Sequence, residues 1–205
     1  GKLVNEIIDI GNVDLEIQVE RTNRKRTISL QVKNNKLIIK TPRSVSKKTL
    51  VDLIKRKQHW IKQKAILNFE EQNLKNREFI DNDKFYFRGD EYRLSLILGR
   101  KEAVKIEGDL LLVSYVDDKS IGRGTIKRLL EDWYLKESTK ILKARTEELA
   151  QLMRVQPCGI TVKNYNSKWG SCTANNKISY NWRIIMAPDH IVDYLIVHEL
   201  SHIIE

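Results

Sequence analysis

The sequence predicts an α+β fold, in which a β-rich N-terminal region with a basic helix precedes a core made of a long helix, a β-hairpin and a final helix. Two observations favour this class. Apolar residues alternate in short runs over residues 15–41 and 79–116, as in half-buried strands. They follow helical spacing in three further segments, which begin after Pro42, at Thr125 and after Pro188. We therefore expect two parts, residues 1–118 and 119–205.

The first part opens with a predicted hairpin. Residues 27–32 and 36–41 alternate in polarity and are separated by Lys33-Asn34-Asn35, and asparagine tolerates the backbone of a tight turn. After Pro42, Ser44 or Ser46 is placed to cap a helix. Its apolar positions are Leu50, Leu53, Ile54, Ile61 and Ala65. Strands are expected again from Phe79 to Val116, separated at Gly89-Asp90, Gly99-Arg100 and Gly108-Asp109.

The second part begins with a long amphipathic helix. Thr125 is its expected cap, the helix reaches about Met153, and Pro157 is expected to end it. Residues 159–163 and a second hairpin, residues 169–172 and 177–182, follow. A final helix starts at Asp189 after Pro188. We find no internal sequence repeat.

Composition is that of a globular protein, with 41% hydrophobic and 31% charged residues among 205. The apolar run from Ile191 to Leu200 is interrupted by charged residues and is shorter than the roughly 20 residues that span a bilayer, so no membrane contact is expected. Because no export signal is visible, we expect a cytoplasmic protein. Cys158 and Cys172 are too few for a disulfide scaffold.

Positive charge is concentrated in one segment. The chain has a formal charge of +10, but residues 21–64 contain 15 Lys/Arg and a single acid, Asp52, and so carry +14. Clustered cations are typical of surfaces that bind nucleic acid. A solvated basic face is the alternative, and the sequence leaves both open, as it does the oligomeric state.

The last predicted helix carries His198-Glu199-x-x-His202. Histidines four residues apart lie on one helix face, where both imidazoles can bind one Zn²⁺. Glu199 is then placed to act as general base toward a metal-activated water. The alternative is a chance pair of histidines at a helix end. The apolar surroundings favour the metal site, because burying these polar groups without partners is costly.

Several neighbours are candidates for substrate contact. They are Trp169, Lys168 and Tyr180, with Lys168, Tyr180 and Asn166 as candidate donors to an oxyanion. The alternatives are hairpin packing for Trp169 and solvation for Lys168. Cys172 as a nucleophile is disfavoured, since the nearest bases are better used as metal ligands.

Trp169-Gly-Ser-Cys172, the strand with Ile178 and Asn181, and Val197-His-Glu-Leu-Ser-His202 together resemble the YgjP-like predicted zinc metallopeptidases. The resemblance implies a zincin-like core, a zinc cofactor and a peptide or protein substrate that pairs with the hairpin strand as a sheet edge. The same order of hairpin and helix is more distantly similar to SprT-like and WLM proteases, families linked to cleavage of proteins attached to DNA.

The resemblance also implies a third zinc ligand. In this family a histidine lies six residues beyond the second one, at position 208, whereas the sequence ends at Glu205. We therefore expect the third ligand beyond Glu205, a core truncated at its C-terminus, and weak zinc binding or none, with loss of activity, in this chain.

Two other functions stay open at this stage. One is a metal-dependent hydrolase of nucleotide phosphoanhydrides, in which the basic segment attracts the substrate. The other is a nucleic-acid-binding module with a degenerate metal site.

Overall fold

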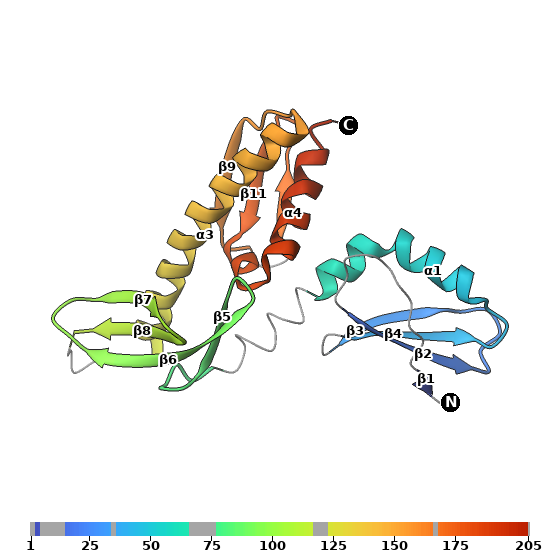
Figure 1. Cartoon of the computed structure of the whole chain (residues 1–205), viewed down its shortest axis with the longest axis horizontal. Helices are drawn as coiled ribbons and strands as arrows, with labels where there is room; N and C mark the ends of the chain where they lie inside the picture. Colours follow the sequence, from blue (N-terminus) through green and yellow to red (C-terminus); the bar gives the residue numbers. More distant parts are fainter. Residues whose placement is uncertain are drawn as a thin grey trace. The chain divides into compact units, whose positions relative to one another are not determined.

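The structure is a computed structural model that describes residues 3–4, 15–33, 36–65, 77–116, 123–165 and 168–204. It contains helices and three small sheets, so the predicted α+β class is confirmed (Figure 1). The chain divides into two compact units, Gly1–Gln72 and Asn73–Glu205, which we call the N-terminal and C-terminal units. No helix in the described ranges is long and apolar enough to cross a membrane.

The N-terminal unit contains a four-stranded sheet in the order β1-β2-β4-β3. Its strands are β1 (Leu3–Val4), β2 (Glu16–Thr22), β3 (Ser29–Lys33) and β4 (Lys36–Pro42). β3 and β4 pair antiparallel, which confirms the first predicted hairpin; the turn at Asn34-Asn35 lies outside the described residues. β2 and β4 pair parallel, which the sequence did not indicate.

Helix α1 (Lys47–Arg56) packs on this sheet. Ser46, one of the two predicted caps, accepts a hydrogen bond from the Thr49 backbone N–H at 3.1 Å. Residues 58–65 are helical as well. The predicted stripe is confirmed in part, because Leu50, Ile54 and Ile61 are fully buried whereas Leu53 and Ala65 are half-buried. Their strand partners in the core are Ile17, Val19, Val32, Leu37 and Ile39.

The C-terminal unit begins with a sheet in the order β5-β6-β8-β7. The strands are β5 (Lys84–Phe87), β6 (Asp90–Leu98), β7 (Ala103–Glu107) and β8 (Leu110–Tyr115), with turns at the glycines expected from the sequence. The pairings run antiparallel, parallel, antiparallel, as in the first sheet. In both units a helix follows the fourth strand, so one topology occurs twice without a sequence repeat.

The β5–β6 turn is docked on the rest of the C-terminal unit. Arg88 and Gly89 both have positive φ, 53° and 86°, as in the tight turns that join antiparallel strands. A Cβ at Gly89 would lie 3.0 Å from Pro188, so the position requires glycine for its backbone and for space. The Gly89 N–H donates to the Met186 carbonyl at 3.0 Å.

Helix α3 (Arg123–Met153) ends at Met153, as the sequence predicts, but its start differs from the prediction. It already includes Arg123, so Thr125 lies within it and is not its cap. It ends before Pro157, because Arg154 adopts a left-handed φ of 57°. The Val155 N–H then reaches the Ala150 carbonyl at 3.0 Å and the Arg154 N–H reaches that of Gln151 at 3.1 Å, which is a Schellman ending.

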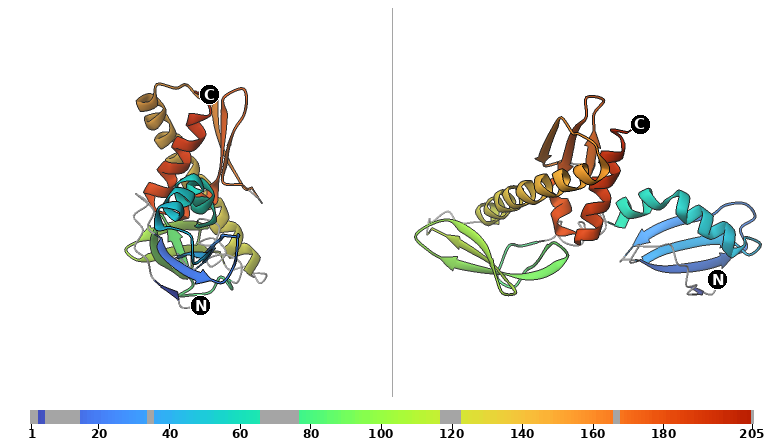
Figure 2. Two further views of the ribbon diagram at one scale, coloured as in Figure 1. Left: turned by 90° about the vertical axis from the view of Figure 1, so that its right-hand side faces the viewer. Right: turned by 45° about the horizontal axis from the view of Figure 1, so that its top comes forward.

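The last sheet has the order β10-β11-β9. It is formed by β9 (Gly159–Lys163), β10 (Gly170–Cys172) and β11 (Lys177–Asn181), and a 3₁₀ helix, η1 (Trp182–Met186), leads to α4 (Asp189–Ser201). The predicted hairpin and final helix are confirmed. α3 and α4 lie on one face of this sheet, with α3 next to β9 and α4 next to β10 (Figure 2).

The boundary between the units lies after Gln72, whereas the sequence analysis placed a division after residue 118. The difference arises because the β5–β8 sheet packs on α3 and η1. Tyr134 of α3 shows this packing: its hydroxyl donates to the Tyr86 carbonyl at 2.7 Å, and its ring stacks on Trp182 at 5.3 Å.

Candidate metal centre

His198 and His202 lie at the C-terminal end of α4 with their ring nitrogens close together. His198 is in the last turn and His202 is the C-cap residue, whose φ and ψ of −64° and −16° remain helical. The two Nε2 atoms are 3.3 Å apart, and the rings are perpendicular with centroids 4.9 Å apart. The motif spacing therefore brings both imidazoles to one point.

This separation fits two ligands of one tetrahedral ion. Zinc–nitrogen bonds are about 2.0–2.1 Å long, and at a tetrahedral angle two such bonds place their nitrogens about 3.3–3.4 Å apart. A direct hydrogen bond between the two rings has a similar length, so zinc analysis is needed to distinguish a metal site from a hydrogen-bonded pair of histidines. Two contacts hold the helix end. The Ser201 hydroxyl donates to the His198 carbonyl at 2.7 Å, and the Tyr194 ring stacks on His198 at 6.4 Å.

Glu199 is buried between α4 and β10, with only 5% of its surface exposed. Burial raises the pKa of its carboxyl above the ordinary value, and the charges of His202 and Lys168 act in the opposite direction. A carboxylate with a raised pKa holds a proton more readily, which suits a group that accepts a proton from water.

Strand β10 makes the space in which Glu199 lies. A Cβ at Gly170 would be 3.0 Å from Glu199 Oε1 and 3.1 Å from its Cγ. The glycine of the Trp-Gly-Ser-Cys segment is thus the direct neighbour of the candidate base. The sequence predicts a hairpin strand here and assigns no role to Gly170.

Lys168 lies on the exposed segment that leads into β10. Its Nζ is 3.3 Å from Ser171 Oγ and 4.8 Å from the centre of the Tyr165 ring. Its charge also lowers the pKa of Glu199. The structure therefore brings Lys168 into the electrostatic neighbourhood of Glu199.

Trp169 and Tyr180 are instead buried, with 3% and 0% of their surfaces exposed. The Tyr180 hydroxyl lies 3.0 Å from the hydroxyl of Thr146 on α3. This burial favours the packing role that was the alternative for Trp169, and it places Tyr180 in the interior as well. Asn166 lies outside the described residues.

Asn181 fixes the segment that carries Lys168. Its Nδ2 donates to the carbonyls of Tyr165 and Lys168 at 3.0 and 3.3 Å, and its Oδ1 caps η1 by accepting from the Arg183 N–H at 3.1 Å. The sequence placed Asn181 in the family pattern but gave no sign of these contacts.

Comparison with known families identifies the chain. The family model of the YgjP-like metallopeptidase domain matches residues 26–205. The chain belongs to this family. Neither the curated proteins nor the solved structures that were compared with it gave a match. Membership in the YgjP-like family indicates a metal-dependent, peptidase-like hydrolase and a divalent metal cofactor.

In the YgjP-like chain, His198 and His202 form a pair whose separation fits such a metal. Within residues 15–33, 36–65, 77–116, 123–165 and 168–204, no three His, Cys, Asp or Glu side chains are grouped so that they could hold an ion. The His198–His202 pair fits a tetrahedral metal on its own, and a catalytic zinc takes one more protein ligand.

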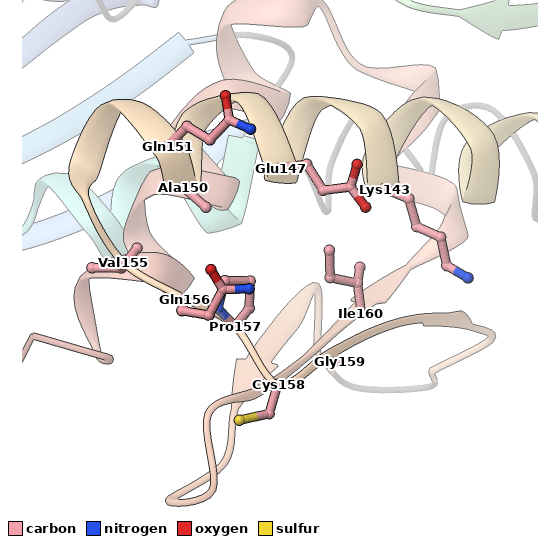
Figure 3. Close-up of a pocket in the computed structure, with 10 residues that line it drawn as sticks. All are labelled: Lys143, Glu147, Ala150, Gln151, Val155, Gln156, Pro157, Cys158, Gly159 and Ile160. Atoms are coloured by element: carbon pink, nitrogen blue, oxygen red, sulfur yellow. The ribbon is translucent and has the colours of Figure 1, made fainter.

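A cavity of about 320 Å³ lies between α3 and the start of β9 (Figure 3). Figure 3 shows Glu147 and Lys143 reaching toward it from α3 and Ile160 facing it from β9. Its walls include none of the predicted site residues. They are Lys143, Glu147, Ala150, Gln151, Val155, Gln156, Pro157, Cys158, Gly159 and Ile160.

Proposed function

We propose that the chain is a zinc-dependent metallopeptidase in which His198 and His202 bind the metal and Glu199 is the general base. The observation that carries this proposal is the 3.3 Å separation of the two Nε2 atoms next to a buried carboxylate, in a metallopeptidase family.

Each residue has a distinct role in this proposal. Zinc, when bound, supplies an acidified water and polarises the scissile carbonyl. Glu199 accepts a proton from the water and passes it to the leaving amine. Its raised pKa makes it a better proton acceptor than an exposed glutamate. Lys168 is placed to stabilise negative charge on the reacting carbonyl oxygen.

Strand β10 is the proposed place for the substrate. In the described sheet β10 pairs with β11 on one side and lies at the edge, and it contacts α4. An extended peptide that adds to this edge gains backbone hydrogen bonds irrespective of its sequence. Because Gly170 of β10 touches Glu199, such a peptide is held close to the candidate base.

The test combines metal analysis with hydrolysis of two substrate classes. The native gene product is loaded with zinc and offered casein and nucleoside triphosphates, alongside Glu199→Gln and His198→Ala/His202→Ala. We expect Glu199→Gln to keep its zinc while casein hydrolysis falls by roughly 10²-fold or more. We expect the double variant to lose the zinc, and chelation to abolish hydrolysis in the unaltered protein.

Equal zinc content in the wild type and the double variant would show that the two rings are only hydrogen-bonded to each other. Consumption of nucleoside triphosphates without casein hydrolysis would show that the chain is a phosphoanhydride hydrolase and not a peptidase. Full activity of Glu199→Gln would remove Glu199 from the mechanism.

A further inference from the structure

Two connecting segments and the start of α1 lie together at one edge of the N-terminal sheet, where β2 and β4 end. β2 and β4 are parallel and end together, with Thr22 opposite Pro42. β3 begins at the same edge, since Ser29 pairs with Lys40. The connections 23–28 and 43–46 therefore leave the sheet side by side, and α1 starts directly after the second one (Figure 1).

These segments carry six cations and no acid. Neither residues 23–28 nor residues 43–49 contain Asp or Glu, and all six cationic side chains are exposed. Within the described ranges no carboxylate pairs with any of them, although Arg24 donates to the Ser29 hydroxyl at 3.3 Å. We call this group the cationic edge; it consists of Arg24, Lys25, Arg26, Arg43, Lys47 and Lys48.

Some other basic residues of the same segment have partners or are buried, whereas Lys33, Lys55, Arg56, Lys57 and Lys64 are exposed as well. Lys36 pairs with Glu16 at 3.2 Å and Lys40 with Glu20 at 3.3 Å, in each case across the β2–β4 ladder. Lys62 is 7% exposed, and burial lowers its pKa. Part of the charge of residues 21–64 is therefore neutralised on the strands, and among the described residues the six cations of the cationic edge have no carboxylate partner.

At the start of the first connection the Arg24 N–H donates to the Thr22 hydroxyl at 3.4 Å, and Arg21 ties the second connection to β2. From the end of β2, its Nη1 donates to the Val45 carbonyl at 2.5 Å and lies 3.4 Å from that of Arg43. Ser46 fixes the start of α1 through its cap. The backbone that carries these cations is therefore tied to the sheet, which reduces the entropy lost when the side chains bind a partner.

We propose that the cationic edge binds the phosphate backbone of nucleic acid. Exposed Arg and Lys side chains spread over three segments suit a row of phosphates, and binding releases the counterions condensed on such a polymer. A membrane surface is the weaker alternative, because anchoring there also uses apolar side chains. Among the described residues of the N-terminal unit, Trp60 is the exposed large apolar side chain, and it lies outside the cationic edge. The proposal does not depend on the metal centre.

The experiment measures binding of the full chain to a fluorescent 20-base-pair DNA duplex and a 20-nucleotide single strand by anisotropy, from about 50 to 200 mM KCl with EDTA present. If all six cations contact phosphates, log K falls with log [KCl] with a slope of about −4 to −5. Lys25→Gln/Arg26→Gln/Lys47→Gln/Lys48→Gln is expected to weaken binding by roughly ten-fold or more and to flatten this slope.

The matched control, Lys55→Gln/Arg56→Gln/Lys57→Gln/Lys64→Gln, removes the same charge from exposed positions away from the cationic edge. It is expected to change affinity less than about three-fold. Circular dichroism melting confirms that both variants fold. The proposal is overturned if the wild type fails to bind at the lowest salt, if both variants lose affinity equally, or if phosphatidylserine vesicles bind as tightly as DNA and compete with it.

Discussion

Glu199 fits beneath β10 because residue 170 has no side chain. At 3.0 Å, the contact between a Cβ at this position and Glu199 Oε1 would be tighter than nine in ten real Cβ contacts, so the carboxylate would have to shift by a few tenths of an ångström. The glycine does not have a positive φ, which means that its backbone tolerates alanine. Its role is therefore to leave space for the candidate base.

Gly170→Ala is expected to displace this carboxylate by a few tenths of an ångström and to lower kcat/KM for peptide hydrolysis by up to about 10-fold, since a misplacement of about 1 Å costs about 10²-fold. Zinc affinity should stay unchanged, because the histidines are not touched. Gly159→Ala is the matched control in β9, where a Cβ meets nothing within 4 Å. Equal activity of the two variants would contradict the role of Gly170.

Tyr180 is expected to matter for stability and not for turnover. Thr146 Oγ1 donates to the Leu142 carbonyl at 2.6 Å, so Tyr180 is the donor in the 3.0 Å bond between the two hydroxyls. Tyr180→Phe should lower the free energy of unfolding by about 1 kcal/mol, measured in urea, with kcat/KM unaltered. Loss of activity at unchanged stability would instead support the predicted contact between Tyr180 and the substrate.

At the residue scale, the sequence predicts those site residues whose arrangement follows from local spacing along the chain. The spacing of His198 and His202 is a helical rule, and the structure brings their nitrogens together accordingly. The contact between Gly170 and Glu199 and the burial of Tyr180 depend on how β10 and α3 pack, which no local pattern encodes.

At the scale of elements, periodicity predicted most helices and strands but not how they pair. The parallel pairs β2–β4, β6–β8 and β9–β11 join strands that are not consecutive, and alternation of polarity contains no information about partners. The end of α3 near Met153 was predicted correctly, but the reason differs: the prediction relied on Pro157, whereas Arg154 in the left-handed conformation ends the helix first.

Asn181 joins three elements and is expected to be costly to remove. Asn181→Ala loses two donated bonds and the cap of η1 from a residue that is 3% exposed. We expect the free energy of unfolding to fall by about 2–4 kcal/mol in urea. Asn181→Asp keeps the cap acceptor but turns a carboxylate oxygen toward the two carbonyl oxygens, so it should destabilise at least as much as the alanine. A neutral effect of the alanine would contradict this account.

The start of α4 is tied to the β5–β6 turn by a two-point ion pair. Arg88 Nε and Nη2 donate to the Asp189 carboxylate at 2.9 and 2.8 Å, and this hydrogen bonding holds the pKa of Asp189 below its ordinary value. A lowered pKa stabilises the fold above the unfolded value of about 3.9, and this contribution disappears as the pH falls through the folded value.

Asp189→Asn should therefore be less stable than the wild type near pH 6, by less than about 1 kcal/mol because the pair is largely exposed to solvent. The difference should vanish as the pH falls below about 3.9. Chemical unfolding at a series of pH values checks this; a difference that grows toward acid would have the wrong sign.

At the scale of the whole molecule, the chain consists of two units with separate cores. The sequence indicated two parts through its change from strands and a basic helix to a long helix. The predicted division lies where strand-like alternation over residues 79–116 gives way to the helix, and it therefore keeps these strands in the first part. Which helix covers a sheet is a property of packing and is not visible in such a pattern.

Leu50→Ala is expected to act on the N-terminal unit alone. Leu50 is fully buried, and its truncation should cost about 2–4 kcal/mol. Hydrogen exchange should accelerate within residues 15–65 while α3 and α4 keep their protection. Leu142→Ala, at an equally buried position in α3, should give the opposite pattern. Loss of protection in both units from either variant would show that they unfold together.

The repeated strand order also bears on how the polypeptide folds during synthesis. In both units all four strands of the sheet precede the helix that packs with it: β1 to β4 come before α1, and β5 to β8 before α3. Strands that pair are separated by short stretches of chain, which favours rapid ladder formation. Because synthesis proceeds from the N-terminus, all four strands of each sheet leave the ribosome before the helix that packs on them.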